Sequence, residues 1–431
     1  MKKYGKYTLL GWGWRILVWM ALTPILLMLL LCVLIYLPPV QKYAVDKTAE
    51  ILSEEMDMDV TVGGVYLRFP LDLTISDMRA LQDGDTIVDV RRLDISVKAR
   101  PLLDSKVEVD GIRLSDAKLN TKELIEAVSI RGTLKELSLD SHSTDLKQEL
   151  AVVNKALVCG ADLVVLLADS VSADTTESAP VNWRVRLDDV RLHDVKAQVR
   201  LAPSADSTWV MAHVSDAFAT GLLDLGREEY AIHKLIVDKT SASFDLMSQP
   251  RLSGQLDPSH LSFHDIGVEV DTFIYKGTGE MSLNLTHLEA REASGLVLAD
   301  VHGHVLMDSL SLHLPRLEVT TADSKLALAY SMDMNTFDEH SPGSLSLVAE
   351  GQLGKDDIIY FTRMGGEATT DVCTMMAQTL PSLPTQLQLK AKGNMQALDV
   401  SRIYLRVPEL AVAEGEAQLF DLVGDMALQT T

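Results

Sequence analysis

The feature that most constrains the fold is an alternation of apolar and polar residues that is repeatedly interrupted by a pair of mostly polar residues. The unit is apolar-x-apolar, two residues, then apolar-x-apolar again. Its clearest copy runs from Val185 to Leu201, and further copies begin at Leu73, Val107, Leu261, Leu283, Leu312 and Leu398. A period of two is the pattern of a β-strand with one apolar face. The chain is therefore predicted to be mainly β.

The interrupting pairs predict bulges or tight turns inside the strands. Strict alternation keeps one face of a strand apolar, and one extra residue in the sequence would turn every following side chain to the other face. Each pair adds one residue to the alternation, as a β-bulge or tight turn would, and so lets the apolar set return to its original face. The pairs are Ser76-Asp77, Asp110-Gly111, Ser115-Asp116, Asp188-Asp189, His193-Asp194 and His264-Asp265. Asp83-Gly84-Asp85 predicts a hairpin turn, and the acidic residues that a calcium loop would need downstream are missing.

The supply of large side chains favours an open sheet over a closed one. The chain has only 8 Phe and 5 Trp, which are few for the core of a sandwich of this length. We therefore expect an elongated, curled antiparallel β-sheet that forms a groove, with an ordinary β-sandwich as the alternative.

The N-terminal segment predicts a membrane anchor. Residues 16–37 contain no charged side chain, and as a helix they would cross a hydrocarbon core of about 30 Å. A cleaved signal peptide is the alternative, but its apolar core is usually shorter and no cleavage site follows. Basic residues precede the segment, so we expect residues 1–15 in the cytoplasm and the remaining chain outside, with the anchor in the inner (plasma) membrane of an envelope.

Helices are predicted at four places. An amphipathic helix is expected within residues 38–57 (Val40 to Met56), and another at Thr144 to Cys159, followed by an acidic linker at residues 170–180. Two short helices are expected at Asp356 to Met364 and Thr370 to Leu380, with Asp356 and Thr370 or Asp371 as caps. The predicted parts are thus 58–140 (β module), 141–182 (helix and linker), 183–354 (repeating β groove), 355–380 (helices) and 381–431 (further strands).

Composition and motifs point away from nucleic acids and catalysis. Lys and Arg total 39 against 61 Asp and Glu, a formal net charge of −22, which repels phosphate backbones. Glycine loops for phosphate, nucleophile elbows and zinc-binding helices are missing, so we expect neither an enzyme nor a cofactor. His302 and His304, with Asp300 nearby, would make a weak metal pair, and a solvated polar face explains them better. Three cysteines do not form a disulfide framework.

The order of these elements resembles the AsmA/TamB-like family of envelope proteins. The resemblance is carried by the anchor, the following helix and residues 58–120, with FPLDLTISD at Phe69, the DGDTI turn and the strand pair LLDSKVEVDGI. Later copies at 183–201, 259–270 and 398–412 resemble the repeating strands of that family. The C-terminal domain of the TamB branch is not seen. The chain stops within a predicted strand, so we expect the N-terminal part of a longer protein.

The resemblance implies a β groove that moves phospholipid between the inner and outer membranes, working with an outer-membrane β-barrel partner. Assembly of outer-membrane or secreted β-barrel proteins and a scaffold without ligand are the alternatives. Neither a metal nor a nucleic acid is implied. The residues that we expect to line the groove are Val107, Val109, Ile112, Leu114, Leu187, Val190, Leu192, Ile403 and Leu405.

Overall fold

The structure is a computed structural model that describes most of the chain beyond the N-terminal segment. Described are residues 37, 39–43, 47, 53, 58–420 and 427–430, except for gaps at 70, 83, 99–100, 102–107, 122–127, 146–148, 168–181, 202–207, 253, 339 and 365–368. Contacts divide the chain into two units, Met1–Leu119 and Asn120–Thr431, and each is treated by itself. Strands make up most of the described residues, which confirms the mainly-β prediction.

The first unit holds a meander of antiparallel strands. Each strand pairs with the next along the chain, and the strands are β1 (Asp59–Arg68), β2 (Asp72–Gln82), β3 (Asp85–Val97) and β4 (Val109–Asn120). Gln82 pairs directly with Asp85, and Gly84 has a φ of +83°. The predicted hairpin turn at Asp83-Gly84-Asp85 is thus confirmed by the residues on either side of position 83.

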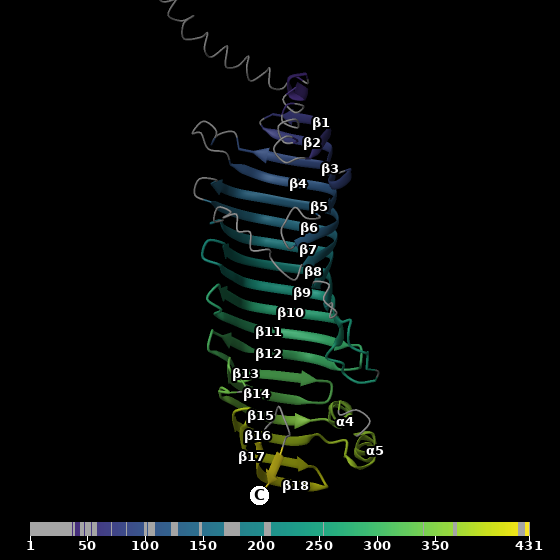
Figure 1. Cartoon of the computed structure of the whole chain (residues 1–431), viewed down its shortest axis with the longest axis vertical. Coiled ribbons are helices and arrows are strands. Elements are labelled where there is room, and N and C mark those ends of the chain that lie inside the picture. The colour runs from purple at the N-terminus through teal and green to yellow at the C-terminus, as the bar shows by residue number, and fades with distance from the viewer. Residues whose placement is uncertain are drawn as a thin grey trace, which may run out of the picture. The chain divides into compact units, whose positions relative to one another are not determined.

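The second unit continues the same plan in further strands, which form an open, curled sheet (Figure 1). They are β5 (Val128–Asp145), β6 (Leu150–Leu167), β7 (Arg184–Leu201), β8 (Thr208–Asp224), β9 (Glu229–Leu246), β10 (His260–Lys276), β11 (Met281–Glu292), β12 (Val297–Met307), β13 (Ser311–Thr321), β14 (Lys325–Asp333), β15 (Leu345–Leu353), β16 (Thr385–Gly393), β17 (Ala397–Val407), β18 (Ala411–Phe420) and β19 (Ala427–Thr430).

One pairing departs from the predicted antiparallel sheet. β6 and β7 run parallel, in register from Leu150 opposite Arg184 to Leu167 opposite Leu201. A parallel pair needs a return connection of roughly a dozen residues or more, and residues 168–183 provide that length. The other strand pairings among the described residues of this unit are antiparallel.

The predicted helix at Thr144–Cys159 is wrong. This stretch contains the end of β5 and most of β6, which pair as an antiparallel hairpin from Asp145 opposite Leu150 outward. The spacing of apolar residues matched a helix, but the segment is rich in valine, which packs well on a pleated surface. Strands on both sides of β6 supply its hydrogen bonds and override the local pattern.

The two helices predicted near residue 360 are confirmed as α4 (Lys355–Arg363) and α5 (Thr370–Thr379). They lie beside the ends of β15 and β16 (Figure 1). The predicted caps are wrong, because the N-cap residues are Gly354 and Thr369 and neither makes a side-chain capping bond. Asp357 instead accepts hydrogen bonds from Thr321 and Ser324, which ties α4 to the turn between β13 and β14.

The polar pairs are backbone irregularities, as predicted. The second residue of four pairs has a positive φ: Asp77 at 50°, Asp116 at 50°, Asp194 at 49° and Asp265 at 52°. Aspartate is one of the few residues that tolerate this left-handed region. At Asp188-Asp189 the pairing with β8 shifts between Leu187 and Val190, and at Asp110 the pairing with β3 shifts as well.

Several of these irregularities lie at one level on neighbouring strands. Matching positions on β6 to β9 are occupied by Gly160, Asp194, Ser215 and Lys239, because the paired residues on either side of them keep one register. The Ser215 Oγ donates a hydrogen bond of 2.7 Å to the Lys239 carbonyl oxygen. Since each strand carries the same extra residue, the apolar faces on both sides of this level stay in register.

The sheet is one layer thick in its described part. Only fifteen apolar residues among those described are buried, and seven of them are alanines. A sandwich of two stacked sheets would bury its large inner-face side chains almost fully. The described strands therefore favour the predicted open sheet over the β-sandwich.

The membrane anchor predicted at residues 16–37 lies outside the described residues, apart from Leu37. Among the described residues there is no helix with the length and apolarity needed to cross a membrane. In the predicted amphipathic helix, residues 40–43, 47 and 53 are helical, and the other positions lie outside the described part.

The left-handed conformation at Asp77 gives a direct test of the bulge assignment. We expect Asp77→Val to lower the free energy of unfolding by about 1–2 kcal/mol, because a β-branched side chain clashes at this φ. Asp77→Gly should have little effect or stabilise slightly. Urea denaturation measures both values.

The control for this test is Asp89→Val, the same substitution on β3. Asp89 has an ordinary φ, and it loses only an exposed ion pair with Arg79, which is worth about 0–1 kcal/mol. If Asp77→Val and Asp77→Gly were equally stable, the left-handed conformation would not be the constraint at this position.

Candidate functional site: an apolar sheet face

The second unit presents one apolar face that continues from strand to strand. Residues directly opposite each other in neighbouring strands point to the same side of a sheet. Cross-strand partners therefore trace rows across the face, one through β7 to β11 (Leu192, Ala217, Val237, Val268, Leu288) and another through β13 to β17 (Leu317, Leu328, Ala349, Leu389, Ile403). Every member of both rows is apolar.

This face is shielded but not covered. Most of its large side chains are half-buried, as on β7, where the apolar positions are half-buried and Arg186, Arg191 and Lys196 are exposed. A cluster of fully buried members lies on β16 to β18, where Ala391, Val400 and Ala417 pack against Leu389, Leu398, Ile403 and Leu419. An antiparallel sheet with one apolar and one charged face normally packs its apolar face on something. Among the described residues of this unit, no second sheet supplies that cover.

The structure brings together most of the predicted lining residues, unit by unit. Leu187, Val190 and Leu192 are neighbours on β7, and Ile403 and Leu405 lie on β17, all on the apolar face of the second unit. In the first unit Val109, Ile112 and Leu114 on β4 lie opposite Val97, Ile95 and Leu93 of β3, on an apolar face of that unit. Val107 lies outside the described residues.

Aromatic residues on the apolar face were missed by the sequence analysis. Tyr230 on β9 and Tyr275 on β10 are stacked, with ring centroids 6.1 Å apart, and they continue the row that starts at Leu223. Phe263 and Phe273 of β10 lie on the same face, opposite Ala242 and Ile232. The alternation that identified neighbouring positions could also have found these four residues.

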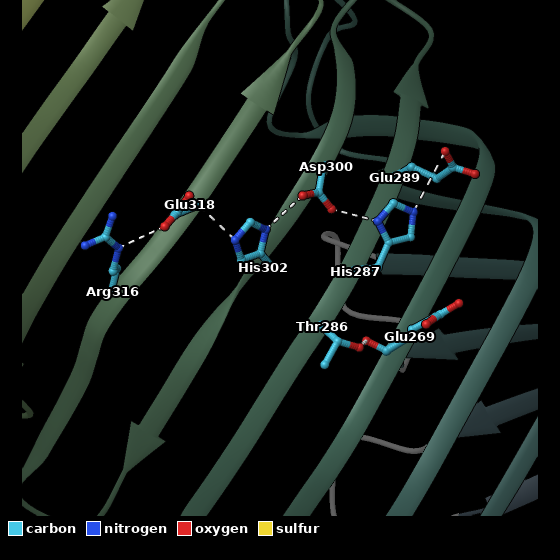
Figure 2. Close-up of polar contacts among 8 residues, drawn as sticks. All are labelled: Glu269, Thr286, His287, Glu289, Asp300, His302, Arg316 and Glu318. Atoms are coloured by element: carbon cyan, nitrogen blue, oxygen red, sulfur yellow. Dashed lines mark hydrogen bonds and ion pairs between the residues drawn. The ribbon is translucent and has the colours of Figure 1, made fainter.

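The opposite face carries a row of histidines and carboxylates on β11, β12 and β13 (Figure 2). Asp300 holds both imidazoles, since its Oδ1 lies 2.7 Å from the His287 Nδ1 and its Oδ2 lies 2.8 Å from the His302 Nδ1. The His302 Nε2 lies 3.6 Å from the Glu318 Oε2. Arg316 closes the row, with its Nε 2.9 Å from the Glu318 Oε1.

Similar pairs occur elsewhere on the polar face. The His193 Nδ1 lies 2.8 Å from the Asp216 Oδ1, and the His213 Nε2 lies 3.0 Å from the Asp194 Oδ1. Asp194 thus serves both as a left-handed bulge residue and as an acceptor. These contacts are cross-strand pairs of opposite polarity, which stabilise a sheet modestly.

The chemistry of this face is that of a solvated polar surface. His304 takes no part in the row of Figure 2, and no group of three His, Cys, Asp or Glu side chains in the described part of the chain has the arrangement to hold a metal ion. The alternative of a metal site at His302 and His304 therefore gains no third ligand among the described residues. The two described cysteines, Cys159 and Cys373, are free.

The ionisation of Asp300 is coupled to its two histidines. Partial burial opposes ionisation, but the hydrogen bonds with His287 and His302 outweigh it and hold the pKa of Asp300 below its ordinary value. A carboxyl group whose pKa falls on folding stabilises the folded state at pH values above its unfolded pKa. That contribution disappears as the pH falls through the folded-state pKa.

Comparisons with family models and with curated proteins find no match for this chain. Support for a function of this chain therefore comes from its sequence and from the two faces of its sheet.

We predict that Asp300→Asn destabilises the protein at pH 7 and that this deficit shrinks as the pH falls below about 4, where unfolded aspartate becomes protonated. The measurement is urea denaturation of both proteins at several pH values between 7 and 3.

The double variant His287→Gln/His302→Gln serves as a control, because it removes the partners of Asp300 and keeps the carboxylate. In the background of this double variant, Asp300→Asn should destabilise the protein less than it does in the parent protein. An Asp300→Asn protein as stable as the parent at pH 7 would contradict the coupling.

Proposed function

We propose that the chain is an inner-membrane-anchored periplasmic protein whose apolar sheet face carries phospholipid acyl chains between the inner and outer membranes. It would act without catalysis, metal or cofactor, and it would work with an outer-membrane β-barrel partner. The observation that carries this proposal is the register-continuous apolar face of β5 to β18, half-buried and without a covering layer among the described residues.

The energetics favour an acyl chain as the occupant of such a face. Exposing a lipid chain to water costs about 0.8 kcal/mol per CH₂, so a sixteen-carbon chain faces about 13 kcal/mol. A continuous apolar surface removes most of this cost while the head group stays in solvent. Because contacts between methylene groups are non-directional, a lipid can move along the sheet without passing a specific polar site.

Two features of the sequence support the location and the role proposed here. Residues 16–37 have the length and apolarity of a single-pass anchor, and basic residues precede them. The anchor, the strand motif at residues 58–120 and the later repeats resemble the AsmA/TamB-like family, for which such a conduit is the implied role. The negative surface charge would keep the exported body from adhering to anionic bilayers over its whole length.

The test compares two adjacent residues of β15 that point to opposite faces. Leu347 lies on the apolar face, between Tyr330 and Ala391, whereas Val348 is 40% exposed on the polar face. We predict that Leu347→Asp strongly reduces the phospholipid that co-purifies with the full chain, whereas Val348→Asp leaves it unchanged. Native mass spectrometry with lipid extraction measures the amount, and circular dichroism confirms that both variants fold.

The outcomes separate the proposed role from its alternatives. Leu192→Asp on β7 should reproduce the loss, because it lies on the same face. Equal lipid content in both β15 variants, or a folded parent protein free of lipid, would overturn the conduit. The second outcome would favour β-barrel assembly or a scaffold role instead.

A further inference from the structure

The connection between β9 and β10 is long and unusually well held. Residues 247–259 join strands whose neighbours are mostly linked by short turns. Asp257, which is 5% exposed, accepts hydrogen bonds from the backbone N–H groups of Leu252 and Ser259. His260 lies 3.1 Å from Asp245 through its Nδ1 and 2.8 Å from the Gln249 carbonyl oxygen through its Nε2. Long loops that are ordered in this way are frequently functional.

This loop and the two helices line an open pocket. Its volume is about 710 Å³, and its walls come from the β9–β10 loop, the last turn of α4 and one side of α5. The described lining residues are Arg251, Leu252, Gly254, Gln255, Arg363, Thr369, Thr370, Cys373, Thr374 and Ala377. The pocket lies within the second unit and at the strand ends, away from the rows that form the apolar face.

The described lining contains two arginines and no carboxylate. The side chain of Arg363 makes no hydrogen bond or ion pair with the residues that the structure describes. One nitrogen of the Arg251 guanidinium lies 2.5 Å from the Asp245 Oδ1, and the Arg251 side chain is 70% exposed. Because a guanidinium has five N–H donors, Arg251 keeps donors for a ligand while Asp245 and the loop hold it in place.

Other groups in the pocket suit an anion as well. Thr370 presents a hydroxyl group, whereas the Thr374 hydroxyl donates to the Thr370 carbonyl oxygen. Thr369 and Thr370 form the N-terminal end of α5, where backbone N–H groups and the helix dipole favour negative charge. The nearest acid along α5 is Asp371, which is not part of the lining. Leu252, Cys373 and Ala377 supply an apolar wall beside the cationic groups.

We propose that this pocket binds a phosphate group through Arg251 and Arg363. Arginine matches the oxygens of phosphate with paired donors, which a point charge such as lysine does not. The site is independent of the proposed lipid conduit, because its residues lie at the strand ends and none belongs to the apolar face. A phosphate group on a lipid head and free phosphate share this chemistry.

The test uses the full chain in a neutral detergent and inorganic phosphate as the probe, followed by ³¹P NMR titration. We expect saturable binding with one site per chain in a protein whose net charge of −22 opposes general anion uptake. Arg251→Gln and Arg363→Gln should each weaken binding about tenfold or more, and the double variant should abolish saturation. Asp245 keeps His260 as a partner in Arg251→Gln.

The matched control is Arg406→Gln on β17. Arg406 is exposed, lies far along the chain from the pocket and makes no described ion pair, so it removes the same charge without touching the site. It should bind phosphate as the parent does. Equal weakening in Arg406→Gln and the double variant, or no saturable binding in the parent, would overturn the site.

A second arm identifies the source of the phosphate. Detergent-free protein in nanodiscs is mixed with vesicles of phosphatidylglycerol or of phosphatidylcholine, and flotation is measured with and without free phosphate. Flotation that free phosphate competes away and that needs both arginines supports a lipid head group. Saturable phosphate binding without such flotation supports a soluble phosphate ligand.

Discussion

In a pleated strand successive side chains point to opposite faces, so a shift of one residue in any pairing would exchange the apolar and polar faces beyond it. This constraint acts along the whole second unit, because each strand takes its register from the previous one. The polar pairs would break the face if each strand carried them at a different height. At the level of Asp194, β6 and β9 also carry a residue with a positive φ, Gly160 and Lys239, at the matching position, so the apolar rows continue across this level.

A sheet of one layer must draw its stability from sources other than a sealed core. The described buried apolar residues are few and often small, so the free energy of folding is spread over many half-buried cross-strand pairs. The polar face adds pairs of opposite charge, such as the row through His287, Asp300 and His302 (Figure 2). Stability distributed in this way leaves an apolar surface accessible, which a compact core would not.

Much of this architecture could be predicted from the sequence because its signal is local. Strict alternation around Val190 and Ile403 placed both residues on the apolar face, and the aspartates of the polar pairs identified positions with left-handed backbone. The helix expected at Thr144–Cys159 failed because the decisive hydrogen bonds come from β5 and β7, which the local pattern does not contain. The parallel pairing of β6 with β7 was missed for the same reason.

The phosphate pocket also lay beyond the sequence pattern. Arg251 and Arg363 are more than a hundred positions apart, and neither sits in a recognisable motif. They come together because the β9–β10 loop is held by Asp257 and His260 and because Asp357 ties α4 to the β13–β14 turn. Both ties are tertiary contacts that only the folded chain supplies.

The most direct test of the central claim places a photoreactive benzoylphenylalanine on each face of β7 and of β17 in the intact cell. At Leu192 and Ile403, on the apolar face, the account predicts light-dependent adducts with the mass of a phospholipid. At the adjacent Arg191 and Arg402, on the polar face, it predicts none. Equal adducts at all four positions, or adducts at none of them, would contradict an apolar face that carries lipid.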